Sequence, residues 1–253
     1  MIPKIIHLCW LSGDPYPDDI KKCLSTWSEH LSDYEIRIWT YKDLEELNSK
    51  WAVQAYEVRK YAFAADFIRL YALYHYGGIY LDSDVFVYKP FEPLLQLPYF
   101  IGEDYTHYFE PAIIGSEKGS EWIKICLDYY SEKHFVNRDG SYNMLPLPAI
   151  FYLCLKDKIV FKKIDGISEF VSKNDTLSIF NYHFFNSRNQ LDIIQTKETY
   201  CSHMYAGSWL DVEEELTFKG AIKKILPKRI LLFVFKITSF LSRENKKYRI
   251  DNK

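Results

Sequence analysis

The sequence contains few cysteines, and they form no recognisable set. The 253 residues include five of them, an odd number, and no two stand in a CxxC arrangement. This argues against a disulfide framework and against a thiolate zinc site, and it favours a reducing compartment. Glycine-rich loops of the GxxxxGK[ST] and GxGxxG types are also absent. The usual phosphate-binding motifs of P-loop and dinucleotide-binding proteins are therefore missing.

The sequence also lacks a hydrophobic run of membrane-spanning length. Its longest run, residues 230–235, resumes after Lys236 as residues 237–241. It stays short of the roughly 20 residues that a spanning helix needs. The strand-like residues 5–10 follow the first residues directly, so we recognise no secretory signal. We therefore expect a cytoplasmic protein that can lie on the inner face of a bacterial cell membrane.

Charge is nearly balanced overall but is divided unevenly along the chain. The formal net charge is -2, yet acidic residues outnumber basic ones 32 to 21 over residues 1–218, and basic residues lead 11 to 2 over residues 219–253. The acidic body argues against nucleic-acid binding. A basic, apolar end is typical of an anchor for anionic lipid, although it could instead pack on the domain. We divide the chain into a domain of residues 1–215 and a membrane-associating tail of residues 216–253.

Short β-like runs alternate with helical patterns, which predicts an α/β fold with helices on both faces of a sheet. We expect strands over residues 4–9, 35–39, 79–81 with 85–87 continuing it, and 99–102. We expect helices over residues 18–30, 42–48, 54–76, 119–134 and 146–157. The third of these helices ends at a Gly-Gly pair, as helices often do.

The residues that carry chemistry concentrate between residues 65 and 85. A helix bearing Asp66 and Arg69 leads through a Gly-Gly turn into an apolar strand that is followed by Asp82 and Asp84. In extended backbone the two later carboxylates point to one side and can bind one hard cation, Mn²⁺ or Mg²⁺, which would neutralise a diphosphate. The competing interpretations are a polar turn for Asp-Ser-Asp and a structural ion pair for the helix residues.

The pattern Ala-x-Asp-x-x-Arg-x-x-x-Leu-x-x-x-Gly-Gly-Ile-Tyr-Leu-Asp-x-Asp, residues 64–84, resembles the DXD signature of glycosyltransferase family thirty-two. That family includes bacterial capsular-polysaccharide transferases and fungal Golgi mannosyltransferases, and the clostridial glucosylating toxins share its core. Residues 2–10 are similar to the family's first strand, and residues 27–39 resemble its second helix and strand. Residues 203–209 resemble its closing His…Ser-Trp segment.

The resemblance implies a GT-A fold, a Rossmann-like open mixed sheet flanked by helices, and a metal-dependent retaining transferase. It assigns catalytic roles to Asp66, Arg69, Asp82 and Asp84. It implies that the nucleotide-sugar donor contacts Leu8, Trp10, Asp66, Arg69, Tyr80, Asp82, Ser83, Ser208 and Trp209. It implies that Mn²⁺, or Mg²⁺, is held by Asp82, Asp84, His203 and Ser208. In this assignment Trp10 stacks on the base and the Trp209 indole N–H contacts the diphosphate. We assign no catalytic base.

The family suggests transfer of a hexose or N-acetylhexosamine from a UDP-sugar, favoured over a GDP-sugar, to a glycan acceptor. A lipid-linked oligosaccharide of capsule, O-antigen or exopolysaccharide synthesis is the acceptor we expect. Three alternatives remain open: a toxin-like effector that glycosylates a host protein, a nucleotidyltransferase or phosphatase, and a non-catalytic sugar-binding module. A module of that kind would not need four charged groups together, and it would bind no nucleotide.

Several positions carry a second interpretation. Trp10 could be a core aromatic, and His203 could be an ordinary solvated or hydrogen-bonded histidine. We interpret His7, which lies between two apolar residues, as a core histidine. Residues 104–110 could shape the sugar pocket or form a surface loop. Residues 145–148 read Leu-Pro-Leu-Pro where the family often has Gly-Pro, which departs from the pattern on the acceptor side.

Overall fold

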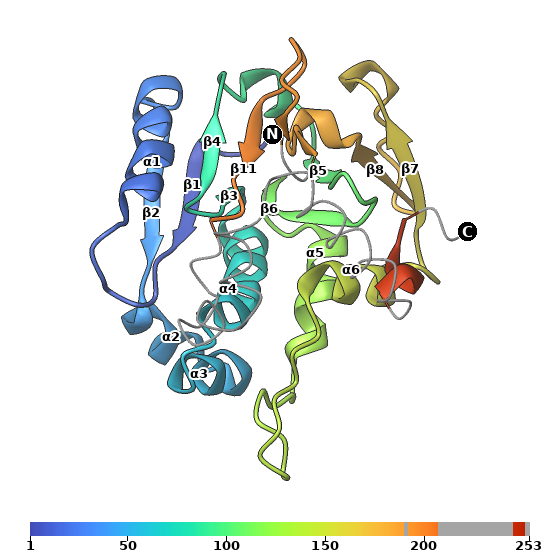
Figure 1. Cartoon of the computed structure of the whole chain (residues 1–253). Coiled ribbons are helices and arrows are strands. Elements are labelled where there is room, and N and C mark those ends of the chain that lie inside the picture. Colours follow the sequence, from blue (N-terminus) through green and yellow to red (C-terminus); the bar gives the residue numbers. More distant parts are fainter. Residues whose placement is uncertain (190–191, 207–244, 251–253) are drawn as a thin grey trace, which may run out of the picture.

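A seven-stranded sheet forms the centre of the computed structural model, which describes residues 1–189, 192–206 and 245–250 (Figure 1). The strands lie in the order β2-β1-β3-β6-β5-β8-β7. Their bounds are Glu35–Trp39 (β2), Ile5–Cys9 (β1), Gly78–Leu81 (β3), Phe109–Ser116 (β6), Tyr99–Glu103 (β5), Thr176–Phe180 (β8) and Val160–Ile164 (β7). All of these strands run parallel except β6, which is antiparallel to both of its neighbours. The carboxyl ends of the parallel strands therefore meet the start of β6 at one edge, where open α/β sheets bind ligands.

Two small antiparallel pairs accompany the sheet. Strand β4 (Val85–Val87) pairs with β11 (Cys201–His203), and β9 (Arg188–Asn189) pairs with β10 (Asp192–Ile193). The expectation that 85–87 continues the strand at 79–81 is wrong. The chain turns at Asp82, whose carbonyl accepts the Val85 N–H over 3.0 Å, and β4 leaves the central sheet. The turn matters for the site because the pairing of β4 with β11 brings a distant part of the chain beside it.

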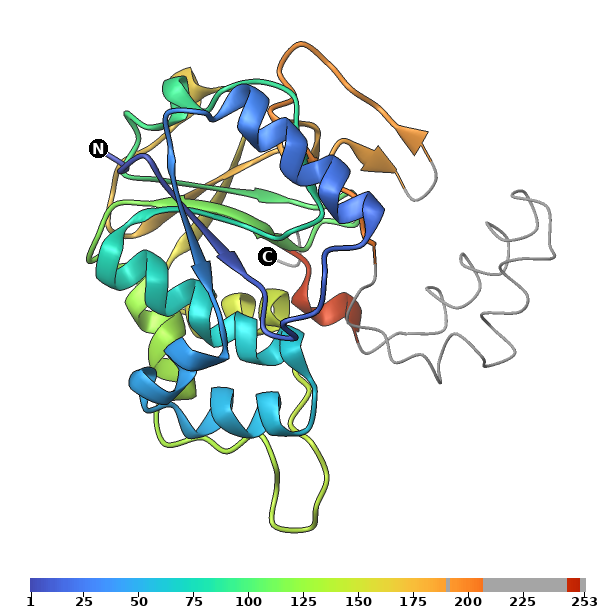
Figure 2. The same cartoon turned by 90° about the vertical axis from the view of Figure 1, so that its left-hand side faces the viewer.

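Helices cover both faces of the sheet, which confirms the α/β fold class. Their bounds are Asp18–His30 (α1), Tyr41–Leu47 (α2), Lys50–Glu57 (α3), Tyr61–Tyr76 (α4), Glu121–Leu127 (α5) and Leu147–Leu155 (α6). Helix α1 lies on one face and α4 on the other (Figure 2). Trp27 of α1 is fully buried, and its indole N–H donates to the Val85 carbonyl over 2.8 Å. An open mixed sheet covered in this way agrees with the arrangement that the resemblance implied.

The single helix expected over residues 54–76 is two helices, α3 and α4. The chain breaks between them at Arg59, whose φ of 59° lies in the left-handed region. The apolar spacing continues across this break, so the period alone did not reveal it. Helix α4 is buried almost all round, and its buried side chains include the charged Asp66 and Arg69. Helices α1, α2 and α6 begin and end close to the expected positions, whereas the helix expected over residues 119–134 ends at Leu127 and is followed by a 3₁₀ turn, Asp128–Tyr130.

The Gly-Gly turn after α4 is required by close packing. Gly78 has a φ of 104°, and a Cβ there would lie 2.5 Å from the Ile5 carbonyl oxygen of β1. His7 lies beside this turn, is fully buried and approaches the Gly77 carbonyl with Nε2 at 2.7 Å. Its Nδ1 accepts from the Trp39 indole N–H over 3.2 Å. The interpretation of His7 as a core histidine is confirmed.

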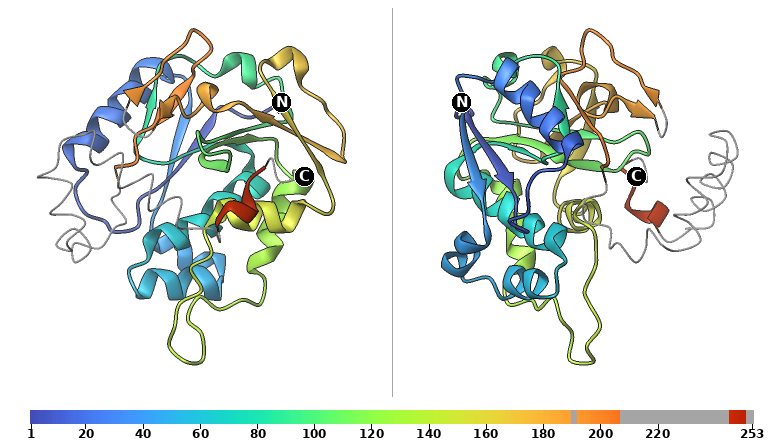
Figure 3. Two further views of the ribbon diagram at one scale, coloured as in Figure 1. Left: turned by 45° about the vertical axis from the view of Figure 1, so that its right-hand side comes forward. Right: turned by 60° about the vertical axis from the view of Figure 1, so that its left-hand side comes forward.

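The described end of the chain packs on the domain. The 3₁₀ turn Asn245–Tyr248 lies against α6 (Figure 3). Ile250 is 5% exposed, belongs to the core cluster that contains α6, and donates its N–H to the His107 carbonyl over 3.0 Å. Most of the tail of residues 216–253 lies outside the described residues. No helix in the described ranges has the length and apolar character to cross a membrane.

Candidate functional site

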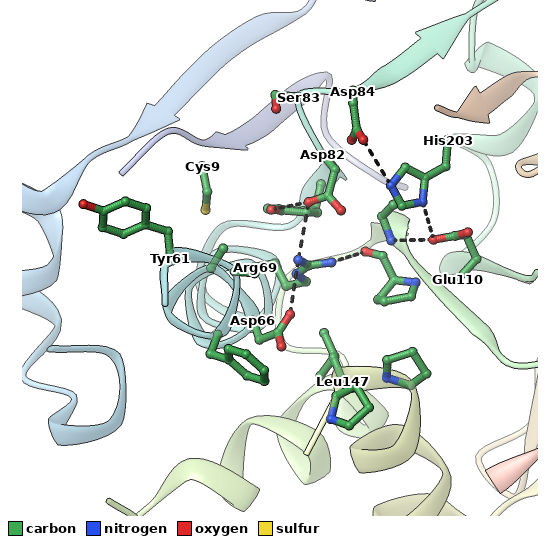
Figure 4. Close-up of a pocket in the computed structure, with 18 of the residues that line it drawn as sticks. Cys9, Tyr61, Asp66, Arg69, Asp82, Ser83, Asp84, Glu110, Leu147 and His203 are labelled. Atoms are coloured by element: carbon green, nitrogen blue, oxygen red, sulfur yellow. Dashed lines mark hydrogen bonds and ion pairs between the residues drawn. The ribbon is translucent and has the colours of Figure 1, made fainter. Parts of the chain in front are cut away.

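A pocket opens at the sheet edge where the parallel strands end (Figure 4). Trp10 follows β1, Asp82 follows β3, Asp104 follows β5, and Glu110 lies at the start of the antiparallel β6. Residues 146–148, at the beginning of α6, line another part of its wall. The cavity of about 380 Å³ has the size of small-molecule sites. The fold thus collects residues from many strands at one edge.

Arg69 is at the centre of the charged groups in this pocket. Its side chain is 6% exposed, and Nη2 lies 3.2 Å from Asp66 Oδ1 and 3.3 Å from Asp82 Oδ1. Nη1 donates to the Pro111 carbonyl over 2.7 Å, while Nε has no hydrogen-bond partner among the described residues. The structural ion pair with Asp66 therefore exists, and the same pair lines the pocket.

Burial changes the acidity of the two carboxyl groups beside Arg69. Burial raises the pKa of Asp66 to about 7, although Arg69 opposes the shift. Burial also raises the pKa of Asp82 above its ordinary value, again against the charge of Arg69. The Tyr80 hydroxyl donates to Asp82 Oδ1 over 2.8 Å. Perturbed carboxyl groups that face a cavity are typical of functional sites.

Asp82, Asp84 and His203 offer ligand atoms that all lie within 4.8 Å of one another. The two carboxylates converge through the turn at residues 82–84, and not through extended backbone as expected from their spacing. An octahedral ion with bonds of about 2.1 Å places opposite ligands roughly 4 Å apart. Small side-chain movements would therefore fit these three atoms to Mn²⁺ or Mg²⁺.

Glu110 completes this cluster, and the sequence analysis did not single it out. It is 3% exposed, and its Oε1 lies 3.2 Å from His203 Nδ1, whereas His203 Nε2 lies 3.4 Å from Asp84 Oδ2. Burial disfavours a charged His203, but the two carboxylates outweigh it and hold the histidine pKa well above its ordinary value. A carboxylate within the apolar run of β6 was the available signal, by the same argument that selected Asp66.

The remaining predicted site residues are distributed as follows. Trp10, Tyr80 and Ser83 line the pocket, and Trp10 donates its indole N–H to the Asp14 carbonyl over 2.7 Å. Leu8 is 1% exposed in the core and is not among the pocket-lining residues. Ser208 and Trp209 lie outside the described residues. From residues 104–110, Asp104, Phe109 and Glu110 line the pocket.

Residues 17–101 match the family model described as "Glycosyltransferase sugar-binding region containing DXD motif". These residues are therefore similar to the sugar-binding region of DXD glycosyltransferases. The resemblance to DXD sugar transferases is thereby confirmed, and the matched residues include Arg69 and the Asp82–Asp84 turn. The half of the site that comes from Glu110 and His203 lies beyond the matched residues.

Curated relatives of the matched region include proteins named as mannosyltransferases. The chain is 30% identical over 126 residues to inositol phosphoceramide mannosyltransferase 3 of Schizosaccharomyces pombe, which covers 48% of this chain and 35% of that protein. It is 34% identical over 109 residues to a mannosyl phosphorylinositol ceramide synthase of Saccharomyces cerevisiae, covering 40% and 27%. The chain thus spans about a third or less of these relatives' lengths.

Two further similarities come from a virus and from a solved structure. An uncharacterised glycosyltransferase of Acanthamoeba polyphaga mimivirus is 28% identical over 162 residues, covering 57% of this chain and 60% of that protein. The solved structure of the PaToxG glycosyltransferase superimposes with a TM-score of 0.46 at 21% identity, covering 62% of this chain and 70% of that one.

Proposed function

We propose that this protein is a metal-dependent retaining glycosyltransferase that transfers a hexose or N-acetylhexosamine from a nucleotide sugar to a glycan acceptor. The observation that supports this proposal is the convergence of Asp82, Asp84 and His203 on one point of the pocket, beside the buried guanidinium of Arg69. A sugar-binding module that works by aromatic stacking has no use for this set of converging charged groups.

Six of the pocket-lining residues have a role in the proposed reaction. Asp82, Asp84 and His203 would hold the ion, which when bound supplies positive charge to the diphosphate of the donor. Arg69 supplies a second, fixed positive charge at the pocket wall. Asp66 lines the same wall and can accept a hydrogen bond from a sugar hydroxyl. Trp10 offers an aromatic ring to the base.

The proposed donor is a UDP-sugar, with a GDP-sugar as the competitor. The sequence resemblance favours UDP for a bacterial member of the family. The mannosyltransferase names of the curated relatives favour a mannosyl donor instead, and the fungal mannosyl branch of the family uses GDP. A titration with both nucleotides separates these two donors.

We further propose a lipid-linked glycan acceptor at the cytoplasmic face of a bacterial membrane, as in capsule, O-antigen or exopolysaccharide synthesis. One relative is named an inositol phosphoceramide mannosyltransferase, and the basic residues of 219–253 can bind anionic lipid. The test keeps the chain full-length, because the turn at residues 245–248 packs on α6 and Ile250 lies in the core. Replacing Lys223, Lys224, Lys228 and Arg229 with Gln should abolish sedimentation with phosphatidylglycerol vesicles. Unchanged sedimentation would contradict this proposal.

The donor site is tested by calorimetric titration of UDP and GDP, each with and without Mn²⁺. We expect one nucleotide to bind in the presence of Mn²⁺ only, and Asp84→Ala to abolish this binding. Asp157→Ala is the matched control, because that carboxylate is exposed and does not line the pocket. If neither nucleotide binds under any condition, the transferase proposal fails and a glycan-binding module becomes the better account.

A further inference from the structure

We propose that Glu110 is a positioning residue that orients His203 and fixes which of its ring nitrogens faces the metal. This inference rests on the proposed metal site, and it extends that site to a residue outside the matched DXD region. Glu110 itself binds no metal in this account. It acts only through the histidine.

The two nitrogens of His203 face different partners (Figure 4). Nε2 lies 3.4 Å from Asp84 Oδ2 and belongs to the cluster with Asp82, whereas Nδ1 lies 3.2 Å from Glu110 Oε1. An imidazole that binds a metal through one nitrogen keeps its proton on the other. With Nε2 at the metal, Nδ1–H donates to Glu110, and this hydrogen bond fixes both the tautomer and the plane of the ring.

Glu110 is itself held by several donors, so it can serve as a fixed reference for the ring. The Ala112 N–H donates to Oε1 over 3.2 Å. The Tyr205 hydroxyl donates to Oε2 over 3.0 Å, and the Asn186 amide donates to the same oxygen over 2.5 Å. The Tyr205 ring also stacks on His203, with 4.0 Å between ring centroids. A carboxylate that is 3% exposed and bonded at both oxygens has little freedom to rotate.

The fold explains how residues so distant in sequence meet. Strand β6 is antiparallel, so its first residues, including Glu110, lie at the edge where the parallel strands end. The irregular register between β5 and β6 falls between Ile101 and Gly102, and Gly102 then pairs with Glu110. The pairing of β11 with β4 places His203 opposite Val85, next to the Asp84 turn. The carboxylate and the metal ligands thus come from independent elements.

The test measures Mn²⁺ affinity without any turnover, using Mn²⁺ alone and the electron paramagnetic resonance signal of the free ion. Glu110→Gln should weaken Mn²⁺ binding by about 10- to 100-fold, the usual effect of removing such a supporting carboxylate. The same substitution in a protein that already carries His203→Ala should change the affinity by less than about twofold, because the residue through which Glu110 acts is gone.

Glu103→Gln is the matched control. Glu103 is 1% exposed on the neighbouring strand β5, lies 3.1 Å from a histidine nitrogen of its own, His107, and does not line the pocket. Its substitution removes a buried charge beside a histidine, as Glu110→Gln does, but it should leave Mn²⁺ affinity unchanged. Thermal unfolding of each variant shows whether that variant is folded under the conditions in which its Mn²⁺ affinity is measured.

The unmodified protein gives a second readout if Glu110→Gln does not fold. Long-range ¹H–¹⁵N spectra with the diamagnetic Mg²⁺ should place the His203 proton on Nδ1. The inference is overturned by a proton on Nε2, by equal losses in the Glu110 and Glu103 variants, or by the same loss in the His203→Ala background. Absence of Mn²⁺ binding to the unmodified protein would instead overturn the proposed metal dependence, and this inference with it.

Discussion

The guanidinium of Arg69 lies 3.3 Å from the carboxylate of Asp82, so one charge pair joins helix α4 to the DXD turn. Arg69 also pairs with Asp66, three residues earlier on the same helix. All three side chains line the pocket. The helix and the turn of the segment that the sequence singled out are therefore in direct contact. The ion pairs of Arg69 with Asp66 and Asp82 contribute both to stability and to the proposed function.

Arg69→Met should destabilise the protein by about 3 kcal/mol, because it leaves buried carboxyl groups without their counter-charge. Adding Asp66→Asn should recover part of that loss, since one uncompensated group is removed. Urea unfolding at pH 7 measures both effects. Arg138→Met, at an exposed position, is the control and should change stability by less than about 0.5 kcal/mol. Equal effects of the two arginine substitutions would show that the buried pair contributes nothing special.

Gly78→Ala should be far more damaging than Gly119→Ala. Both glycines have positive φ, but a Cβ at Gly119 meets nothing within 4 Å, whereas one at Gly78 would lie 2.5 Å from the Ile5 carbonyl oxygen. The backbone strain alone is worth about 1 kcal/mol. We expect roughly that loss at Gly119 and about 3 kcal/mol or more at Gly78, measured by urea unfolding. Similar losses at the two sites would contradict the close packing of β3 on β1.

His7 should make stability depend on pH between about 6.5 and 4. Burial lowers its pKa to about 4, so in this window the unfolded chain binds a proton that the folded protein does not. The contribution of His7 to the free energy of unfolding is fully present above pH 6.5. It falls by about 3 kcal/mol as the pH drops to 4. Urea unfolding at pH 7 and 4.5 should show a smaller pH-dependent loss for His7→Gln than for the unmodified protein. The same loss in both proteins would exclude His7 as the source.

Ile250→Ala should destabilise the domain by about 2 to 4 kcal/mol, as expected for a core aliphatic side chain. Ile250 is 5% exposed in the cluster that contains α6, whereas Ile38 on the edge strand β2 is 47% exposed. Ile38→Ala is therefore the control and should stay within about 0.5 kcal/mol. Thermal or urea unfolding measures the stability lost in each of the two variants. A harmless Ile250→Ala would mean that residues 245–250 do not belong to the folded domain.

Local patterns predicted the parts of the fold that depend on neighbours in sequence. Helix α1, strand β2 and the Gly-Gly turn after α4 all lie where hydrophobic period and turn residues indicated. Asp66, Arg69, Asp82 and Asp84 were selected because charges stood in apolar sequence. The break at Arg59 was missed because the apolar period of α3 continues in α4.

Long-range pairing explains what the sequence could not predict. Nothing near Glu110 in sequence indicates His203, because their contact depends on the antiparallel course of β6 and on the pairing of β11 with β4. A polar turn at Asp-Ser-Asp was among the interpretations, but the departure of β4 from the central sheet was missed for the same reason, since β4 pairs with a strand more than a hundred residues later. A single sequence shows which residues can take part in chemistry, but it does not show which distant residues they contact.

The most direct test of the central claim is nucleotide release from a panel of UDP-hexoses, UDP-N-acetylhexosamines and GDP-mannose, measured with Mn²⁺, with EDTA and with Asp84→Asn. The account predicts turnover of donors carried on one nucleotide in the presence of Mn²⁺. It also predicts a loss of at least roughly 100-fold when the metal is chelated or the carboxylate is removed. Turnover that persists in EDTA and in the Asp84→Asn variant would contradict the role assigned to the Asp82, Asp84 and His203 cluster.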